Sequence, residues 1–339
     1  MRIGLAVNLK SEAVRPTGPV TDDWDEEFDS PETVESLAAV IRALGHEPVL
    51  LGDGEALIKR VLEHRPDFVF NIAEGTGVGR SREARVPAFL EMLGIPYSGS
   101  DPLTLSAALD KAIARKLVEG GAVRVPRGFT VEATDTESLI ATRAGELVFP
   151  LVVKPAWEGS SKGIRARCLV DDAAELVRII SELRRDYAQS LLVEEFVSGA
   201  ELTIGIVGNS PPRIVGVMEV VPLQQSDRFL YSLEVKRNWR ECVRYESPAR
   251  LSPETQRQIE SAALEAWERL GCRDLCRMDF RLNAVGEPVF IEANPLPGLN
   301  PITSDLVLLA KGMGLTHEDL IREILSASLS RVGLSSLGK

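Results

Sequence analysis

The first hundred residues alternate between short apolar runs and longer segments that carry apolar residues on one face. The apolar runs predict strands at residues 2–8, 46–52, 67–74 and 95–100. The one-faced segments predict helices at residues 31–44, 55–65 and 84–94. Such alternation predicts an α/β domain with a doubly wound, mostly parallel sheet. Its functional loops should follow the carboxyl ends of the strands, near residues 8–32 and 71–83.

The pattern changes from residue 106 onward. An amphipathic helix is predicted at residues 106–122, and two smaller α+β units follow it. Their predicted strands lie at residues 128–131, 147–156, 191–197, 201–208 and 213–223. Their predicted helices lie at residues 171–186, 253–271 and 316–329. We therefore expect three domains, at residues 1–105, 106–199 and 200–339.

Residues 276–298, CRMDFRLNAVGEPVFIEANPLPG, predict a hairpin whose turn is centred on Gly286. Alternate residues of a strand share a face, so two sets of side chains should meet: Arg277, Asp279 and Arg281 on the first strand, and Phe290, Glu292 and Asn294 on the second. Carboxylate and amide oxygens are hard ligands suited to Mg²⁺. The hairpin thus favours a metal site, and the alternative is a structural ion pair between Arg277 and Glu292.

Two stretches carry lysines that could contact phosphates. In residues 152–164, Lys154 ends an apolar strand and small residues follow it, which would let backbone N–H groups approach an anion. The alternative is a flexible surface turn. On the helix at residues 108–116, Lys111 and Arg115 lie one turn apart, a spacing that is also typical of a solvated basic face.

A third stretch, residues 191–202, is a strand that ends in two carboxylates. Glu194 and Glu195 close the strand, and Glu201 follows a short turn. These groups could accept hydrogen bonds from an adenine edge or a ribose hydroxyl. A solvated strand end is the alternative interpretation.

Composition narrows the class of protein. The chain has 339 residues, of which 44% are hydrophobic and 26% charged, and its formal net charge is −11. This charge argues against nucleic acid or an anionic membrane as partner. Four cysteines show no metal-binding spacing, and no apolar run approaches the length of a membrane-spanning helix. We therefore expect a soluble cytoplasmic protein that acts on small molecules.

The order of these motifs resembles the ATP-grasp superfamily, and within it the D-alanine–D-alanine ligases. The sequence runs from LEMLGIPYSGS and ALDK through VVKPAWEGSSKG and LLVEEFV to RMDF and IEANPLPG. The resemblance covers nearly the whole chain. It implies an α+β ATP-grasp fold, with an N-terminal Rossmann-like parallel-sheet domain before two ATP-grasp subdomains. It also implies a homodimer that uses ATP with two Mg²⁺ ions, or Mn²⁺ in their place.

The resemblance further assigns roles to individual residues. The implied ATP-binding residues are Lys111, Lys154, Glu158, Ser160, Ser161, Glu194, Glu195, Phe196, Val197, Glu201 and Lys236. The implied metal ligands are Asp279, Glu292 and Asn294. The implied catalytic groups are Arg277 and the Gly298 backbone at the tetrahedral intermediate, Ser160 in the loop that excludes water, and Glu32 at the first substrate's amino group. Thr303 or Ser304 corresponds to the site of the second substrate's carboxylate.

Departures from the family pattern concern the amino-acid pockets. A long acidic loop follows the first strand, Glu74 and Gly75 stand where the family usually has histidine and glycine, and Arg237 replaces an aromatic residue. The acidic loop, Glu74 and Glu83 suggest a cationic or larger amine as substrate. Two alternatives stay open: a ligase of this fold for another amino acid, peptide or small acid, and a nucleotide-binding module without catalysis. The complete set of polar site residues argues against the second.

Overall fold

The computed structural model describes residues 1–15 and 20–334, and these form three β-sheets. The N-terminal sheet is parallel, with strand order β2-β1-β3, as the alternating pattern predicted. Its strands are β1 (Arg2–Ala6), β2 (Glu47–Gly52) and β3 (Phe68–Asn71). Its helices are α1 (Pro31–Ala43), α2 (Gly54–His64) and α3 (Arg85–Leu93), and a short 3-10 helix, η1, spans Lys10–Glu12. The predicted strand at residues 95–100 is reduced to one bridge between Tyr97 and Val69.

Helix α1 begins as the sequence predicted. The Ser30 hydroxyl accepts a hydrogen bond from the backbone N–H of Thr33 at 3.3 Å, and Pro31 occupies the first helical position. This cap satisfies one of the N–H groups that a helix start leaves unpaired. Leu37 and Ile41, one turn apart, are fully buried on the inner face. The cap and the apolar stripe together place α1 against the sheet.

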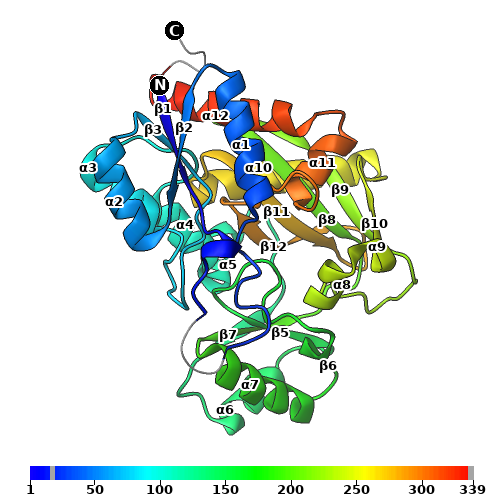
Figure 1. Ribbon diagram of the computed structural model, residues 1–339. Helices are drawn as coiled ribbons and strands as arrows, with labels where there is room; N and C mark the ends of the chain where they lie inside the picture. Colours follow the sequence, from blue (N-terminus) through cyan, green and yellow to red (C-terminus); the bar gives the residue numbers. More distant parts are fainter. Residues whose placement is uncertain (16–19, 335–339) are drawn as a thin grey trace.

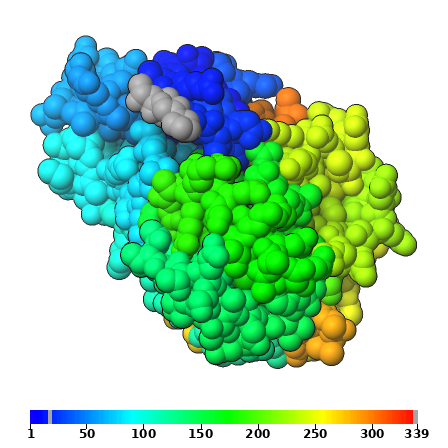
Figure 2. Space-filling view, turned by 90° about the horizontal axis from the view of Figure 1, so that it is seen from below, coloured from blue at the N-terminus to red at the C-terminus, as the bar shows by residue number. Residues whose placement is uncertain are grey.

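The central sheet has four strands in the order β4-β7-β5-β6. They are β4 (Gly128–Val131), β5 (Leu151–Pro155), β6 (Leu169–Val170) and β7 (Leu191–Glu195), all paired antiparallel. The helices of this part are α4 (Pro102–Leu109), α5 (Lys111–Val118), α6 (Glu137–Ala144), α7 (Ala173–Tyr187) and the 3-10 helix η2 (Ala166–Cys168). Helix α7 packs its apolar face on the sheet and closes a separate core. In Figure 2 this unit, in green, lies between the blue N-terminal segment and the yellow part of the chain.

The single helix predicted at residues 106–122 is wrong, because the chain breaks at Asp110. This residue is extended, with φ −81° and ψ 99°, and its side chain accepts a hydrogen bond from the N–H of Ile113. Aspartate favours such a capping role over a helix interior, since its carboxylate competes for backbone N–H groups. As a result α5 begins at Lys111, whose N–H donates to the Ala156 carbonyl at 3.0 Å.

The C-terminal sheet is antiparallel, with strand order β10-β9-β8-β11-β12. Its strands are β8 (Glu201–Gly208), β9 (Pro212–Pro222), β10 (Val243–Glu246), β11 (Asp274–Leu282) and β12 (Pro288–Asn294). Its helices are α8 (Leu233–Arg237), α9 (Trp239–Cys242), α10 (Pro253–Leu270), α11 (Asp305–Gly312) and α12 (His317–Arg331). Helix α10 covers one face, and α11 and α12 cover the other. Helix α12 also meets α1, so the first and last parts of the chain share one core (Figure 1).

The predicted hairpin is confirmed as β11 and β12. Asp279 lies opposite Glu292, and Arg277 lies opposite Asn294. The placement of Phe290 on the same face as Glu292 is wrong, because Ile291 is an extra residue that shifts the register. Phe290 instead packs edge to face on Phe280 in the core, with ring centroids 5.6 Å apart. Such a bulge reverses the side-chain alternation on one strand only, which a strict period of two does not anticipate.

Within the described residues, no helix has the length and apolar character needed to cross a membrane.

Candidate active site

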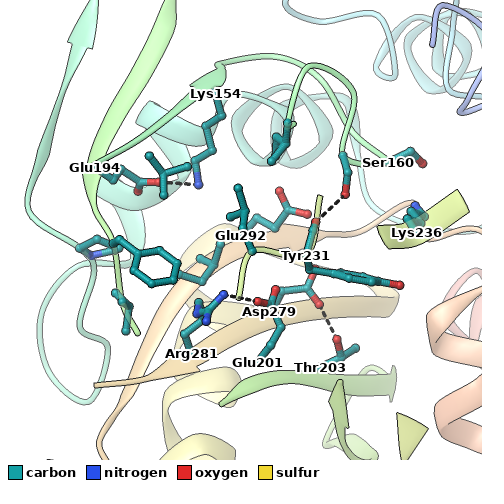
Figure 3. Close-up of a pocket in the computed structure, with 18 of the residues that line it drawn as sticks. Lys154, Ser160, Glu194, Glu201, Thr203, Tyr231, Lys236, Asp279, Arg281 and Glu292 are labelled. Atoms are coloured by element: carbon teal, nitrogen blue, oxygen red, sulfur yellow. Dashed lines mark hydrogen bonds and ion pairs between the residues drawn. The ribbon is translucent and has the colours of Figure 1, made fainter. Parts of the chain in front are cut away.

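A cavity lies between the central and C-terminal sheets (Figure 3). Strands β5 and β7 contribute one wall and strands β8, β11 and β12 the other, while residues 158–164 and 230–236 close over it. It brings together most of the residues predicted to bind a nucleotide: Lys154, Glu158, Ser160, Ser161, Glu194, Glu195, Phe196, Val197, Glu201 and Lys236. Arg277, Asp279 and Glu292 from the hairpin also line it. We call it the nucleotide cavity.

Lys154 and Glu194 form a buried ion pair on one wall of this cavity. The Lys154 ammonium lies 2.5 Å from the Glu194 carboxylate, and both side chains are at most 5% exposed. Arg115, on α5, lies 3.1 Å from the other oxygen of Glu194. One buried carboxylate therefore holds two cations in place, and Lys154 lines the cavity where it could meet a phosphate.

Glu201 and Arg281 form a second ion pair at the far end of the cavity, 2.5 Å apart. The Arg281 guanidinium also lies over the ring of Phe196, 4.8 Å from its centroid. Burial raises the pKa of Glu201, although Arg281 acts in the opposite direction. The Phe196 ring offers a flat apolar surface beside this ion pair.

The hairpin carboxylates lie beside two cations. Arg277 donates to Asp279 Oδ2 at 2.9 Å, and the Lys111 ammonium lies 3.2 Å from Glu292 Oε2. Burial alone would raise the pKa of Glu292, but Lys111 and Arg277 hold it well below the usual range. Burial raises the pKa of Asp279 to about 7 despite Arg277. The geometry is thus compatible with a metal site, since the carboxylates converge. It is also compatible with a structural ion pair, since Arg277 lies close to both carboxylates.

The donor set of the hairpin fits a hard divalent ion. Asp279 is oriented by the Thr203 hydroxyl, which donates to it at 2.8 Å, and the Asn294 amide contacts Glu292 at 3.2 Å. Lys111 and Arg277 place positive charge beside these oxygens, at a position where a bound metal ion would also place it. Within the part of the chain that the structure describes, no three carboxylate, imidazole or thiol side chains converge to form a metal cluster. A bound Mg²⁺ would therefore need Asn294, water or phosphate oxygens to complete its shell.

The loop between β5 and η2 adopts a conformation that side chains disfavour. Ser160 and Ser161 have φ values of 50° and 59°, in the left-handed region. For residues with a Cβ atom this costs about 1–2 kcal/mol each. The Ser161 hydroxyl donates to the Tyr231 carbonyl at 3.4 Å, so the loop contacts the segment before α8. Other contacts must hold such a loop in place, and these are described below.

A second, smaller cavity adjoins the first. Arg277, Glu292, Glu158 and Ser160 line both. The smaller cavity also contains Lys111, Asn294 and Gly298, together with Glu74 and Glu83 from the loop after β3. We call it the acid cavity because of these two glutamates.

Glu74 and Glu83 have no hydrogen-bond or ion-pair partner among the described residues, although Glu83 is only 7% exposed. Burial raises the pKa of Glu83 to about 7, and burial together with the neighbouring Glu83 charge raises the pKa of Glu74 well above its usual value. Glu83 is buried and Glu74 is half-buried, and neither carboxylate has a hydrogen bond or ion pair to a described residue, which favours a cationic ligand in the space between them.

The titration of Glu83 gives a testable pH dependence. Between pH 4.5 and about 7 the folded protein retains a proton that the unfolded chain has released, so the free energy of unfolding falls as pH rises. For a pKa raised from 4.5 to about 7, this fall is on the order of 3 kcal/mol. Urea unfolding at pH 5 and pH 7.5 measures the difference in the free energy of unfolding between the two pH values. We expect this difference to be smaller in Glu83→Gln by the contribution of Glu83.

Replacement of an exposed glutamate on α2, Glu63→Gln, is the matched control and should keep the wild-type difference between the two pH values. An identical pH dependence in Glu83→Gln and wild type would contradict the buried-acid assignment.

Four predicted residues lie outside both cavities. Glu32 is exposed on the first turn of α1, and Thr303 is exposed and donates to the Asn300 side chain. Ser304 precedes α11 at its N-cap position, but its hydroxyl accepts from the Asn300 N–H instead of capping the helix. Arg237 pairs with Asp22 and Glu26. Their predicted substrate roles stay predictions.

Sequence patterns missed several residues that line the nucleotide cavity. Thr203 lies opposite Asp279 in the register of β8 and β11, so only the strand pairing reveals it. Tyr231 approaches from the segment before α8, and Asp305, the first residue of α11, lies 3.4 Å from Arg277. No local pattern marks such positions, since their neighbours in space are distant in sequence.

Comparisons with known proteins identify the family. A family model described as the D-ala D-ala ligase C-terminus matches residues 127–326, more than half of the chain. An uncharacterized protein of Sinorhizobium fredii is 31% identical over 305 residues, covering 88% of this chain and 87% of its own length. A D-alanine–D-alanine ligase of Halalkalibacterium halodurans is 30% identical over 299 residues, covering 87% and 92% respectively.

Solved structures show the same fold. The crystal structure of a Bacillus anthracis D-alanine–D-alanine ligase complexed with ATP matches with a TM-score of 0.74 and 23% identity over 98% of both chains. The VanG D-Ala:D-Ser ligase of Enterococcus faecalis matches with a TM-score of 0.71 and 21% identity, covering 96% of this chain and 99% of its own. The predicted family and fold are confirmed. The chain therefore belongs to the D-alanine–D-alanine ligase family and is an ATP-dependent ligase with the ATP-grasp fold.

Proposed function

We propose that this ligase joins a carboxylate to an amine through an acylphosphate, using ATP and Mg²⁺, to form a dipeptide or a related amide. The observation that carries the proposal is the wall shared by the two cavities. Arg277, Glu292, Glu158 and Ser160 line both, so a phosphate bound on one side and an acid bound on the other would meet there. The reaction needs such a junction, because phosphate passes directly from ATP to the acid.

Activation of the acid explains the need for ATP. A carboxylate is a poor acyl donor, since oxide is a poor leaving group. Attack of the carboxylate oxygen on the γ-phosphorus forms an acylphosphate and releases ADP; the amine then attacks the acyl carbon, and inorganic phosphate leaves. Lys154, Lys111 and Lys236 supply positive charge for the phosphates. Asp279, Glu292 and Asn294 would hold Mg²⁺, which offsets phosphate charge when it is bound.

Two groups would stabilise the oxyanion formed during amine attack. The Arg277 guanidinium is a planar donor that already spans Asp279 and Asp305. The Gly298 backbone lines the acid cavity. A side chain at Gly298 would place its Cβ 2.9 Å from the Ser304 hydroxyl, so glycine permits this close approach. Ser160 and Ser161 would keep water away from the acylphosphate.

The test is ADP formation that depends on the added amine. Purified protein, ATP and Mg²⁺ are combined with pairs of D- and L-amino acids, and ADP and the ligated product are measured together. We expect product and ADP in equal amounts for at least one pair. The absence of amine-dependent ADP formation with every pair would instead support a nucleotide-binding module without catalysis.

A second candidate concerns the substrate. The unpartnered Glu74 and Glu83 favour a cationic or larger amino acid over D-alanine. We expect a higher kcat/KM for a basic amino acid such as a diamino acid than for D-alanine. Turnover with D-alanine alone would contradict this specificity and support the simpler D-alanine–D-alanine activity. A ligase for another small acid is the remaining possibility, and adding small carboxylic acids to the amino-acid pairs tests it.

We propose further that the enzyme is a cytoplasmic homodimer with domains at residues 1–105, 106–199 and 200–339. The cysteines support a reducing compartment, since Cys168, Cys242, Cys272 and Cys276 are all free. Light scattering of the purified protein tests the dimer, and a mass of one chain would contradict it. Replacing Mg²⁺ by Mn²⁺ should support turnover.

A further inference from the structure

The acidic loop at residues 21–30, in which this chain departs from the family pattern, makes contacts that have no role in the proposed reaction. Four of its carboxylates face other parts of the molecule: Asp22, Asp23, Glu26 and Glu27. We call this set the acidic clamp. Most of their partners lie on the loop at residues 158–165 of the central unit or on α8 of the C-terminal unit, and Arg82 and Tyr187 add two more. In Figure 2 the blue N-terminal segment lies directly against the green central unit.

Glu27 holds the first half of the loop at residues 158–165, which we call the phosphate loop. Its carboxylate accepts a hydrogen bond from the Gly159 N–H at 2.8 Å and lies 3.0 Å from the Lys162 ammonium. Arg82, only 1% exposed, lies 2.6 Å from the same carboxylate. Burial opposes ionisation, but Arg82 and Lys162 lower the pKa of Glu27 to about 2. Glu27 is therefore a buried, fully charged anchor for this loop.

Asp23 holds the second half. Its Oδ2 accepts from the Gly163 N–H at 2.9 Å and from the Tyr187 hydroxyl at 2.7 Å, and the Asp23 side chain is fully buried. The two anchors thus bind backbone N–H groups at either side of Ser160 and Ser161. Those serines have the left-handed backbone described above, which persists only where surrounding contacts impose it.

Asp22 and Glu26 extend the clamp to the third part of the molecule. They lie 2.8 Å and 2.9 Å from the Arg237 guanidinium, and Asp22 also pairs with Arg165. Arg237 follows Lys236, which lines the nucleotide cavity. Neighbouring carboxylates on one short segment therefore connect the phosphate loop to the helix that carries Lys236.

We propose that the acidic clamp holds the phosphate loop closed over the nucleotide cavity before any nucleotide binds. Asp22, Asp23, Glu26 and Glu27 act as positioning residues, because they act through the loop and α8 rather than on the substrate. A loop closed in advance excludes water from the acylphosphate during the whole reaction. The part of this inference that concerns catalysis rests on the proposed function, and the part that concerns the loop does not.

Hydrogen–deuterium exchange of the nucleotide-free protein tests the closed loop. In the wild type we expect slow exchange of the peptide that covers residues 157–165, since the Gly159 and Gly163 N–H groups are bonded to carboxylates. Glu27→Gln should accelerate this exchange at least about ten-fold, because it removes a charge-assisted acceptor and two ion pairs. Asp25→Asn removes a carboxylate of the same segment that has no such contact with any described residue, and residues 157–165 of this variant should exchange at the wild-type rate.

The second measurement is the amount of phosphate released per molecule of ligated product. We expect a ratio near one for the wild type and for Asp25→Asn, and about two or more for Glu27→Gln, because water then reaches the acylphosphate. Arg237→Gln provides a second variant in case Glu27→Gln does not fold, and it should raise both exchange and the ratio. Circular dichroism confirms that each variant is folded.

Unchanged exchange at residues 157–165 in a folded Glu27→Gln or Arg237→Gln variant would overturn the clamp. Faster exchange with an unchanged phosphate ratio would overturn its role in excluding water. If the wild type shows no amine-dependent turnover, the proposed function fails, but the exchange experiment still decides whether the loop is closed in advance.

Discussion

Arg277→Lys should lower kcat by about 10²- to 10³-fold while the protein stays folded, which is the range for loss of a donor to a developing oxyanion. Arg277 donates to Asp279 through Nε and Nη2 at 3.2 and 2.9 Å, and its Nη1 lies 3.4 Å from Asp305. Lysine keeps the charge but loses this planar fork, so it cannot hold both carboxylates and also face the substrate. Amine-dependent ADP formation at saturating ATP measures the effect.

The matched control is Arg244→Lys. Arg244 lies on β10 of the same sheet and pairs with Glu246 at 2.8 Å in a largely exposed position. Its replacement should leave kcat within about two-fold, since exposed ion pairs contribute little. Wild-type kcat in Arg277→Lys would remove Arg277 from the proposed chemistry.

Asp279→Asn should reduce turnover by about 10³-fold or more, because it removes one of the two proposed carboxylate ligands of Mg²⁺. The substitution preserves shape, so the Thr203 hydroxyl can still donate to the remaining side-chain oxygen, and the fold should be retained. Turnover is measured over a titration of Mg²⁺ at fixed ATP. The loss should be smaller at high Mg²⁺ if the remaining ligands still bind the ion weakly.

Glu287→Gln is the control for charge removal on the same hairpin. Glu287 lies in the turn before β12 and pairs with Arg124 at 2.8 Å, away from both cavities. Turnover of this variant should equal that of the wild type. If Asp279→Asn also matched the wild type at every Mg²⁺ concentration, the metal assignment would be wrong.

The local pattern of residues was sufficient for much of the fold. Strict alternation in residues 276–282 predicted the polar face of β11, because the side-chain period of a strand is two. The same rule failed for Phe290, since the bulge at Ile291 depends on how β12 pairs and packs. A continuous helix at residues 106–122 failed for a related reason: the capping preference of Asp110 and its contacts outweighed the helical periodicity.

The candidate site shows the same division. Lys154 and Glu194 were each assigned to a nucleotide from their own strand ends, but only the pairing of β5 with β7 makes them one ion pair. Glu32 was predicted to bind the amino group of the first substrate, yet it is exposed, whereas Glu83 is buried in the acid cavity. The spacing of residues along the chain does not show which of these glutamates is buried, because burial depends on segments that are distant in sequence.

The sequence by itself determined the alternation of strands and helices in the N-terminal part, the polar face of the hairpin and the family, because these follow from short-range periodicity and from motifs in a defined order. Only the tertiary structure decided that TDDWDEEFD is a clamp. Glu27 meets Lys162 from 135 residues away, and Asp22 meets Arg237 from 215 residues away. A carboxylate in a loop is normally solvated; whether it becomes a buried anchor depends on which distant cations and N–H groups the packing brings to it, since only these offset the loss of its water.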